Sequence, residues 1–135
     1  MKIILPVLII AVAACGPSSG RRPASGEIAL AVQPAAPSPG DSVHLTLSNR
    51  TAGQVGYNLC TSRLERQTGA GWEPIPSGRV CTMEIRGLPA GEEADYTLAL
   101  PADLEPGSYR YATDVEPPDP AGRTPVASEP FRVQP

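Results

Sequence analysis

Short runs in which apolar and polar residues alternate constrain the fold of this chain more than any other feature. The runs EIALAV, DSVHLTLSN, VGYNLC, YTLAL, SYRYAT and PFRV follow one another between residues 27 and 133. A period of two places the apolar side chains on one face of a β-strand. Turn sequences such as PSPGD, TGAG, PAGEE and LEPG separate the runs. Since no window has a sustained helical period, we expect an all-β domain.

The spacing of the runs predicts seven to eight short strands, which is typical of a sandwich or a barrel. We favour an antiparallel β-sandwich, because two sheets with one apolar face each can bury those faces against each other. The 17 prolines and 13 glycines then serve as loop punctuation. The residues that alternation aligns within the strands are Ile28, Leu30, Val32, Val43, Leu45, Leu47, Val55, Tyr57, Leu59, Tyr96, Leu98, Leu100, Tyr109, Tyr111, Thr113, Phe131 and Val133.

The first residues, MKIILPVLIIAVAAC, form an apolar run that Lys2 precedes and Pro6 interrupts. The run is too short to span a bilayer, which needs about 20 residues, but it fits the apolar region of a secretory signal. Val12-Ala13-Ala14-Cys15 resembles a bacterial lipobox. The resemblance implies that residues 1–14 are a lipoprotein signal peptide and that Cys15 is acylated. A plain signal peptide cut after Ala14 and a buried N-terminal strand are the alternatives.

The next stretch, GPSSGRRPASG, contains no Leu, Ile, Val or aromatic residue. Its Gly, Ser and Pro content is typical of a flexible tether. We therefore expect a lipidated cysteine and tether over residues 15–26 and one domain over residues 27–135. Two or three acyl chains on Cys15 would hold the protein stably at a membrane, whereas one chain holds only marginally.

Cys60 and Cys81 remain once Cys15 is assigned to the anchor. In an oxidising compartment two cysteines of a small domain usually pair. Closing a loop of about 20 residues stabilises the fold by roughly 3 kcal/mol in the chain-entropy model. We expect the bridge to tie a strand end to the neighbouring strand across the hairpin SRLERQTGAGWEPIP, with Trp72 covering the bridge or the edge of the core. No cysteine or histidine spacing supports a metal site.

The sequence offers no catalytic constellation and implies no cofactor. His44, the single histidine, lies on the polar face of its run, so we interpret it as a solvated side chain. A triad would need a carboxylate and a nucleophile beside it, and a small hydrolase using His44 is the least favoured hypothesis. The 11 basic and 14 acidic residues are interspersed, with no basic stripe for nucleic acid.

The order LTLSNRT, YNLCTSRLER, GWEPIPSGRVC, LPAGEEADYTLAL and LEPGSYRY resembles bacterial immunoglobulin-like domains of exported proteins. The matching positions are Asn49, Tyr57, Leu59, Trp72, Pro74, Leu88, Gly91, Leu104, Pro106, Gly107, Tyr109 and Arg110. The resemblance covers about residues 27–135 and implies an immunoglobulin-like β-sandwich. Intracellular proteinase inhibitors of the BsuPI type share this architecture, although the lipobox and the cysteine pair depart from them. Tyr109 fits either a tyrosine corner, with its hydroxyl bonded to upstream backbone, or an ordinary interfacial tyrosine.

Residues 115–127, VEPPDPAGRTPVA, are expected to form a stiff irregular loop between the last two strands. Within it Glu116, Asp119 and Arg123 are candidate binding residues, because inter-strand loops often carry recognition. The alternative is a proline-rich loop that merely blocks edge pairing. The sequence therefore predicts a monomeric, non-catalytic lipoprotein of the cell envelope. Its domain would bind or space envelope proteins or glycans, or alternatively inhibit a proteinase through the 115–127 loop.

Overall fold

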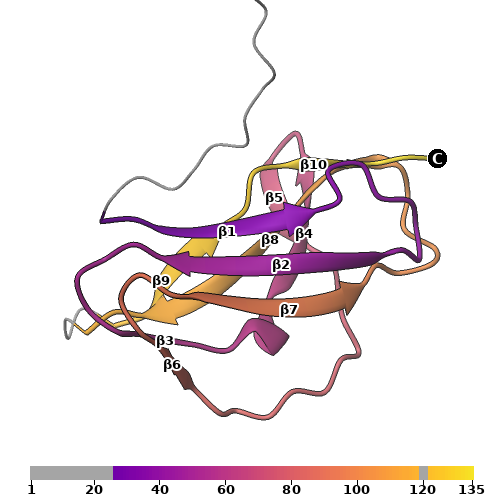
Figure 1. Cartoon of the computed structure of the whole chain (residues 1–135). Helices are drawn as coiled ribbons and strands as arrows, with labels where there is room; N and C mark the ends of the chain where they lie inside the picture. The colour runs from indigo at the N-terminus through magenta and orange to yellow at the C-terminus, as the bar shows by residue number, and fades with distance from the viewer. Residues whose placement is uncertain (1–25, 119–121) are drawn as a thin grey trace, which may run out of the picture.

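A computed structural model describes residues 26–118 and 122–135, and over these residues the expected all-β antiparallel sandwich is confirmed (Figure 1). The strands are β1 (Ile28–Gln33), β2 (Ser42–Asn49), β3 (Val55–Tyr57), β4 (Arg63–Thr68), β5 (Gly71–Pro74), β6 (Arg86–Leu88), β7 (Glu93–Ala99), β8 (Gly107–Glu116), β9 (Thr124–Ala127) and β10 (Phe131–Val133). A single 3-10 turn, η1 (Leu59–Thr61), interrupts the strands. None of the described helical residues could cross a membrane.

The smaller sheet has the order β1-β2-β7, with β2 antiparallel to both neighbours. Two glycine bulges begin its outer strands at the same end. The Gly26 and Gly91 amides donate to the carbonyls of Arg50 and Asn49, and each glycine has a positive φ of 80–85°. A residue with a Cβ rarely adopts that conformation, so these glycines set where β1 and β7 join β2.

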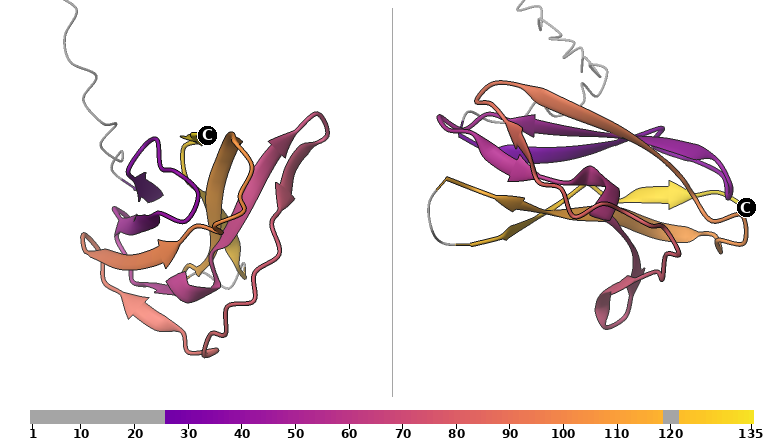
Figure 2. Two further views of the ribbon diagram at one scale, coloured as in Figure 1. Left: turned by 90° about the vertical axis from the view of Figure 1, so that its right-hand side faces the viewer. Right: turned by 90° about the horizontal axis from the view of Figure 1, so that it is seen from below.

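The larger sheet of seven strands is organised around β8, whose ten residues pair along both edges. On one edge β4 pairs with the first half of β8 and β3 with the second half. On the other edge β10 and β9 divide the strand in the same way. The hairpin β4–β5 continues outward and projects away from the sandwich (Figure 2). A single long strand therefore positions most of this sheet.

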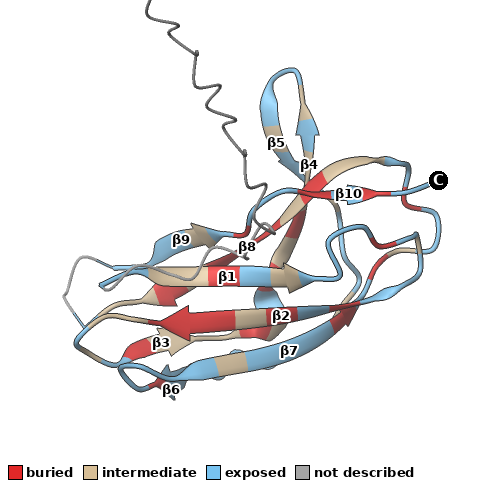
Figure 3. Ribbon diagram, turned by 45° about the horizontal axis from the view of Figure 1, so that its top comes forward, coloured by how far each residue is buried: buried red, intermediate tan, exposed pale blue. Residues whose placement is uncertain are grey.

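The core lies between the two sheets, where the inward faces of β2 and β8 are almost fully buried (Figure 3). Val43, Leu45 and Leu47 have no exposed surface, as their alternation predicts. The rings of Tyr109 and Tyr111 stack on Phe131 with centroids 6.4 and 6.0 Å apart. The buried core residues are Leu30, Val43, Leu45, Leu47, Val55, Leu59, Leu64, Leu88, Leu98, Leu100, Leu104, Tyr109, Tyr111, Ala112, Val115, Phe131 and Val133.

Tyr109 has the geometry of a tyrosine corner. Its ring is fully buried, and its hydroxyl donates a 2.6 Å hydrogen bond to the Glu105 carbonyl just upstream. Burial is the main reason that the pKa of Tyr109 is raised. The turn before β8 is thereby fastened to the interior of the strand that follows it.

Asn49 explains why an asparagine ends the LTLSN run. Its side chain is fully buried, and its Nδ2 donates to the carbonyls of Gly53 (2.8 Å) and Leu88 (2.9 Å). Its Oδ1 accepts bonds from the amide and the hydroxyl of Thr51. A buried amide with satisfied donors and acceptor ties the β2–β3 turn to β6.

Several expectations on individual elements are corrected. The strands number ten rather than seven or eight, because β6 and β9 are short pieces that alternation did not reveal. The VGYNLC strand ends at Tyr57, and Cys60 belongs to η1. Residues 80–85 (VCTMEI), which include Cys81, form no strand, and β6 begins directly after them at Arg86. Tyr96 is exposed rather than buried, because η1 and the segment after β5, not a full strand, lie beneath it.

Candidate functional site: a disulfide-held strap beside a pocket

The segment of residues 75–85, here called the strap, connects β5 to β6 without forming a strand of its own. The Cys60–Cys81 disulfide fastens its middle to η1, with the two Cα atoms 5.8 Å apart. The predicted pairing of the two cysteines is thus present. The bridge does not join two adjacent strands, however, because Cys60 lies in a 3-10 turn and Cys81 in the irregular strap.

Three hydrogen bonds hold the strap on either side of the disulfide. The Asn58 Nδ2 donates to the Thr82 carbonyl at 2.7 Å. The Arg79 guanidinium donates to the carbonyls of Cys60 (2.8 Å) and Ser62 (2.7 Å). At its start, the Ile75 amide donates to the Leu64 carbonyl and the Ile75 side chain packs against the core. The middle of the strap is fixed by side-chain bonds to backbone and by one covalent link.

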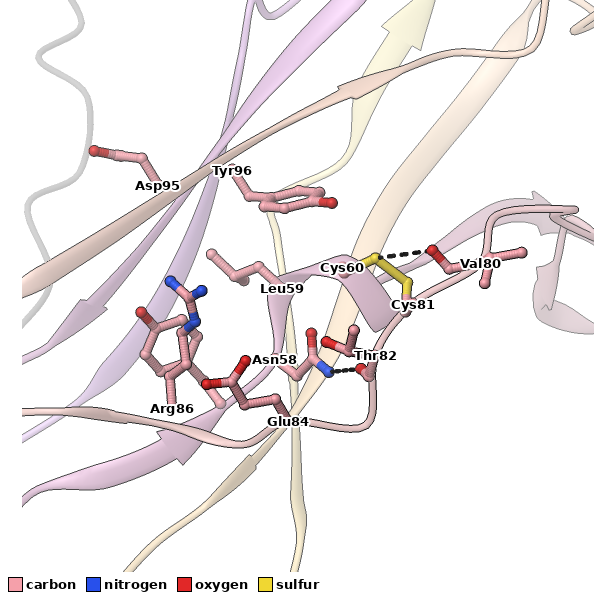
Figure 4. A pocket seen from close by; sticks show the side chains of 11 residues that line it. Asn58, Leu59, Cys60, Val80, Cys81, Thr82, Glu84, Arg86, Asp95 and Tyr96 are labelled. Atoms are coloured by element: carbon pink, nitrogen blue, oxygen red, sulfur yellow. Dashed lines mark hydrogen bonds between the residues drawn. A yellow bond between two sulfur atoms is a disulfide. The ribbon is translucent and has the colours of Figure 1, made fainter.

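A shallow pocket of about 320 Å³ lies between the strap, η1 and the edge strand β7 (Figure 4). Leu59 and the disulfide form its inner part, and the Tyr96 ring faces them from β7 (Figure 4). Glu84 and Arg86 lie together at one end (Figure 4). The pocket thus combines apolar and polar lining, with both signs of charge among its residues.

Two of the large exposed apolar side chains, Val80 and Tyr96, line this pocket. Val80 is 93% exposed and Met83 78% exposed, and both belong to the strap. Ile85 and Tyr96 complete the set of large exposed apolar side chains within the described residues. Scattered exposed apolar residues are normal, but a contiguous group marks an interaction site. A surface of this kind can bind an apolar side chain of a partner.

The Ile85 side chain covers a glycine of the larger sheet. A Cβ at Gly56 would lie 2.8 Å from Ile85 Cγ2 and 3.2 Å from the Glu116 Cβ. Such distances are shorter than real contacts allow, so a side chain at Gly56 would push the end of the strap outward. Gly56 therefore allows the strap to lie close to β3.

His44 lies on the outer face of the smaller sheet, with 52% of its side chain exposed, as its place in the pattern predicts. The side chains that lie next to His44 in space were not predicted from the sequence. Its Nε2 is 3.3 Å from Asp95 Oδ1, and its Nδ1 is 3.2 Å from Thr97 Oγ1. Asp95 also accepts a 2.9 Å bond from the Thr46 hydroxyl. The side chains of this cross-strand network are open to water. They form a polar patch on the outer face of the smaller sheet.

The 115–127 region differs from the expected irregular loop. Glu116 ends β8, and residues 124–127 form β9, which pairs with β8 as a hairpin. The Arg123 Nε bonds to Glu116 Oε1 at 3.1 Å where the two strands meet the connecting loop. Asp119 lies outside the described residues. Two of the three candidate binding residues are therefore brought together, as a surface ion pair.

Trp72 lies on the projecting β4–β5 hairpin, at the place predicted for a hairpin in this sequence. Its ring packs against Arg110 of β8, whose guanidinium carbon is 4.4 Å from the ring centroid. Arg110 also bonds to Glu65 at 2.8 Å. The contact of Trp72 with a cation on the larger sheet was not predicted.

The comparisons with known families and curated proteins add no match to these observations. No protein-family model matches the chain, and no curated protein sequence matches it. The signal peptide predicted over residues 1–14, Cys15 and the tether up to residue 25 lie outside the described residues. Over the described ranges, no group of three or more acidic, histidine or cysteine side chains is placed to hold a metal ion.

Sequence reasoning missed the strap as a surface. Val80, Cys81, Met83 and Ile85 looked like part of a buried strand, and only Cys81 was singled out.

Proposed function

We propose that this protein is a lipid-anchored bacterial envelope protein whose immunoglobulin-like domain is a non-catalytic binding module. The observation that carries the proposal is the group of exposed apolar side chains on and opposite the strap. Val80 lines a pocket together with Leu59 and Tyr96, and the exposed Met83 lies three residues further along the strap. In this proposal the strap surface binds another protein.

The disulfide makes the strap suitable for binding. A segment that is ordered before it meets its partner loses less conformational entropy on binding. Burial of an apolar side chain contributes roughly 1.5–3 kcal/mol, so two or three such contacts give a useful affinity. The mixed charges of Glu84 and Arg86 at the rim would then favour one orientation of the partner.

The N-terminal sequence supports the anchoring part of the proposal. VAAC at residues 12–15 follows an apolar run, and GPSSGRRPASG follows the cysteine. A disulfide is typical of exported proteins, because cytosolic thiols are kept reduced. Export, a lipid on Cys15 and a tethered domain are consistent with each other.

The proteinase-inhibitor alternative has less support. An inhibitory loop has to lie extended in a protease cleft, but residues 115–116 and 124–127 pair with neighbours as strands. The part of the region outside these strands is correspondingly short. The protein can be titrated against serine, cysteine and metalloproteases. Inhibition of any of them at micromolar concentration would support this alternative.

The binding proposal is tested by charge substitution on the strap. The double variant Val80→Asp/Met83→Asp removes two apolar contacts from exposed positions. The control, Gln67→Asp/Ala70→Asp, adds two carboxylates to the exposed β4–β5 hairpin. Full-length chains are purified from membranes of the producing bacterium after cross-linking, and co-purifying proteins are quantified by mass spectrometry. We expect partners that the control retains to fall at least tenfold in the strap variant. Equal recovery of all partners would overturn the proposal.

The anchor is tested separately with an alkyne-bearing fatty acid. The original chain should incorporate the label, and Cys15→Ser should not. Label-free protein from the original chain would overturn the anchoring part while leaving the binding part intact.

A further inference from the structure

The free edge of β1 is a second feature of the molecule with the geometry of a binding site. β1 is the outer strand of the three-stranded sheet, and within the described residues it pairs only with β2. The Arg50 amide donates to the Glu27 carbonyl. Because hydrogen-bonded pairs alternate along an antiparallel ladder, Ala29, Ala31 and Gln33 bond to β2. The backbone groups of Ile28, Leu30 and Val32 therefore point away from the sheet.

A groove of about 590 Å³ runs along this edge. All residues of β1 line it, and the stretch from Ala127 of β9 to Phe131 of β10 lies across from them. Thr46 and Ser48 of β2 and Glu93 of β7 also line it. The groove is the open side of the sandwich opposite the strap. Its length follows the six residues of β1, which span about 20 Å at the usual rise of a strand.

This edge lacks the devices that usually prevent pairing with another chain, namely charges, prolines and bulges within the strand. The sequence IALAVQ has no charged residue and no proline. The neighbouring edges are protected. β7 has Glu93 and Asp95, whose backbone groups lie on its free side by the same alternation, and β9 contains Pro125.

The charges around the groove have one sign. Among the described residues that line it, the charged ones are Glu27, Glu93 and Glu129, and none of these described residues is a lysine or an arginine. Glu93 bonds to Arg50, whereas Glu129 is exposed on the opposite wall. The apolar lining includes Leu30 and Phe131. A ligand that fits must combine apolar side chains with positive charge.

We propose that the β1 edge binds an extended segment of a partner protein in which apolar and basic residues alternate. The segment adds a fourth strand to the smaller sheet and bonds to the free backbone groups of Ile28, Leu30 and Val32. Its apolar side chains enter the groove toward Leu30 and Phe131. Its basic side chains remain at the surface near the glutamates.

Two other occupants match the groove less well. The chain's own residues 16–25 contain Arg21 and Arg22 but no Leu, Ile, Val or aromatic side chain to fill the apolar interior. A second copy pairing through β1 would bring apolar side chains but no basic residue, since IALAVQ follows Glu27. It would also place further carboxylates beside those of the groove.

The test uses a fluorescein-labelled hexapeptide, Arg-Val-Arg-Val-Arg-Val, with an amide at its C-terminus, and the full-length protein in detergent. We expect saturable binding by fluorescence anisotropy, and at least tenfold weaker binding of the peptide with Glu in place of Arg. Ala31→Lys adds a positive charge at an exposed position of β1 and should weaken binding at least fivefold. Val80→Asp/Met83→Asp should leave it unchanged, so failure here and failure of the strap proposal are distinguishable.

Backbone pairing is tested with two N-methylated peptides. One is methylated at the three valine nitrogens and the other at the three arginine nitrogens. Since only one edge of an added strand faces β1, only one of the two peptides should lose binding. Equal binding by both would overturn strand addition, and so would an unchanged affinity for Ala31→Lys.

The remaining outcomes concern the other occupants. Binding that appears only after residues 16–22 are deleted would show that the chain's own tether fills the groove and would overturn the proposal. A concentration-dependent dimer in sedimentation velocity that Ala31→Lys abolishes would overturn it in favour of a second copy. Circular dichroism and the thermal midpoint confirm that each variant is folded.

Discussion

The two open sides of the sandwich are built in opposite ways. Beside β7, the strap, η1 and the Cys60–Cys81 disulfide partly close the space between the sheets and present exposed apolar side chains. Beside β1, no such segment is present among the described residues, and a groove follows an uncharged strand. The first side presents side chains that a disulfide holds in place, and the second offers free backbone groups.

This contrast shows how a small domain can keep two surfaces independent. The strap depends on one covalent bond and a few hydrogen bonds, so its order is local. The β1 side depends on β2, whose inward face belongs to the core. A change that loosens one side should therefore leave the other side intact.

Removal of the disulfide gives the largest expected effect. Cys60→Ser/Cys81→Ser should lower the free energy of unfolding by about 3 kcal/mol, because the unfolded chain regains the entropy of the closed loop. Urea unfolding measures this loss. Hydrogen exchange should accelerate in residues 75–85 of the folded variant and stay unchanged in β1. Equal acceleration on both sides would contradict their independence.

High pH should lower the free energy of unfolding through a tyrosine in the core, which lies between the two open sides. Burial raises the pKa of Tyr111 to about 12, from an ordinary value near 10, with Arg79 of the strap acting in the opposite direction. The folded state therefore keeps the proton that the unfolded chain releases. Stability is fully present below pH 10 and falls as the pH rises from 10 to 12, by roughly 2–3 kcal/mol in all.

Urea midpoints measured between pH 9 and pH 12 check this dependence. Tyr111→Phe should reduce the fall, and Tyr109, whose pKa is also raised, should account for part of what remains. An identical pH dependence in Tyr111→Phe would show that the tyrosine is not responsible.

Surface substitutions should have the smallest effect on stability and the sharpest effect on binding. Ala31→Lys and Val80→Asp each alter an exposed side chain, so each should change the free energy of unfolding by less than about 0.5 kcal/mol. Ala31→Lys should weaken binding at the β1 edge only, and Val80→Asp should weaken binding at the strap only. Loss of both activities in either variant would indicate a single shared surface.

Local pattern was sufficient for much of the fold. Alternation in SVHLTLSN and SYRYAT identified β2 and the inner face of β8, because burial on one face imposes a period of two on the side chains. The hairpin around Thr68–Gly71 and the cysteine pair also followed from short stretches. Pattern failed at Tyr96, whose exposure depends on which distant segment lies opposite it, and it did not indicate that Met83 and Ile85 are exposed.

The sequence by itself determined the all-β class, the central strands and the pairing of Cys60 with Cys81. The tertiary structure alone decided that two sides of the sandwich are open and that the strap covers one of them. It also decided that Glu27 before β1, Glu93 of β7 and Glu129 of the β9–β10 connection line the same groove on the other side. The physical reason is that strand formation and face selection depend on neighbours along the chain. A groove and its charge depend on segments that only folding brings together.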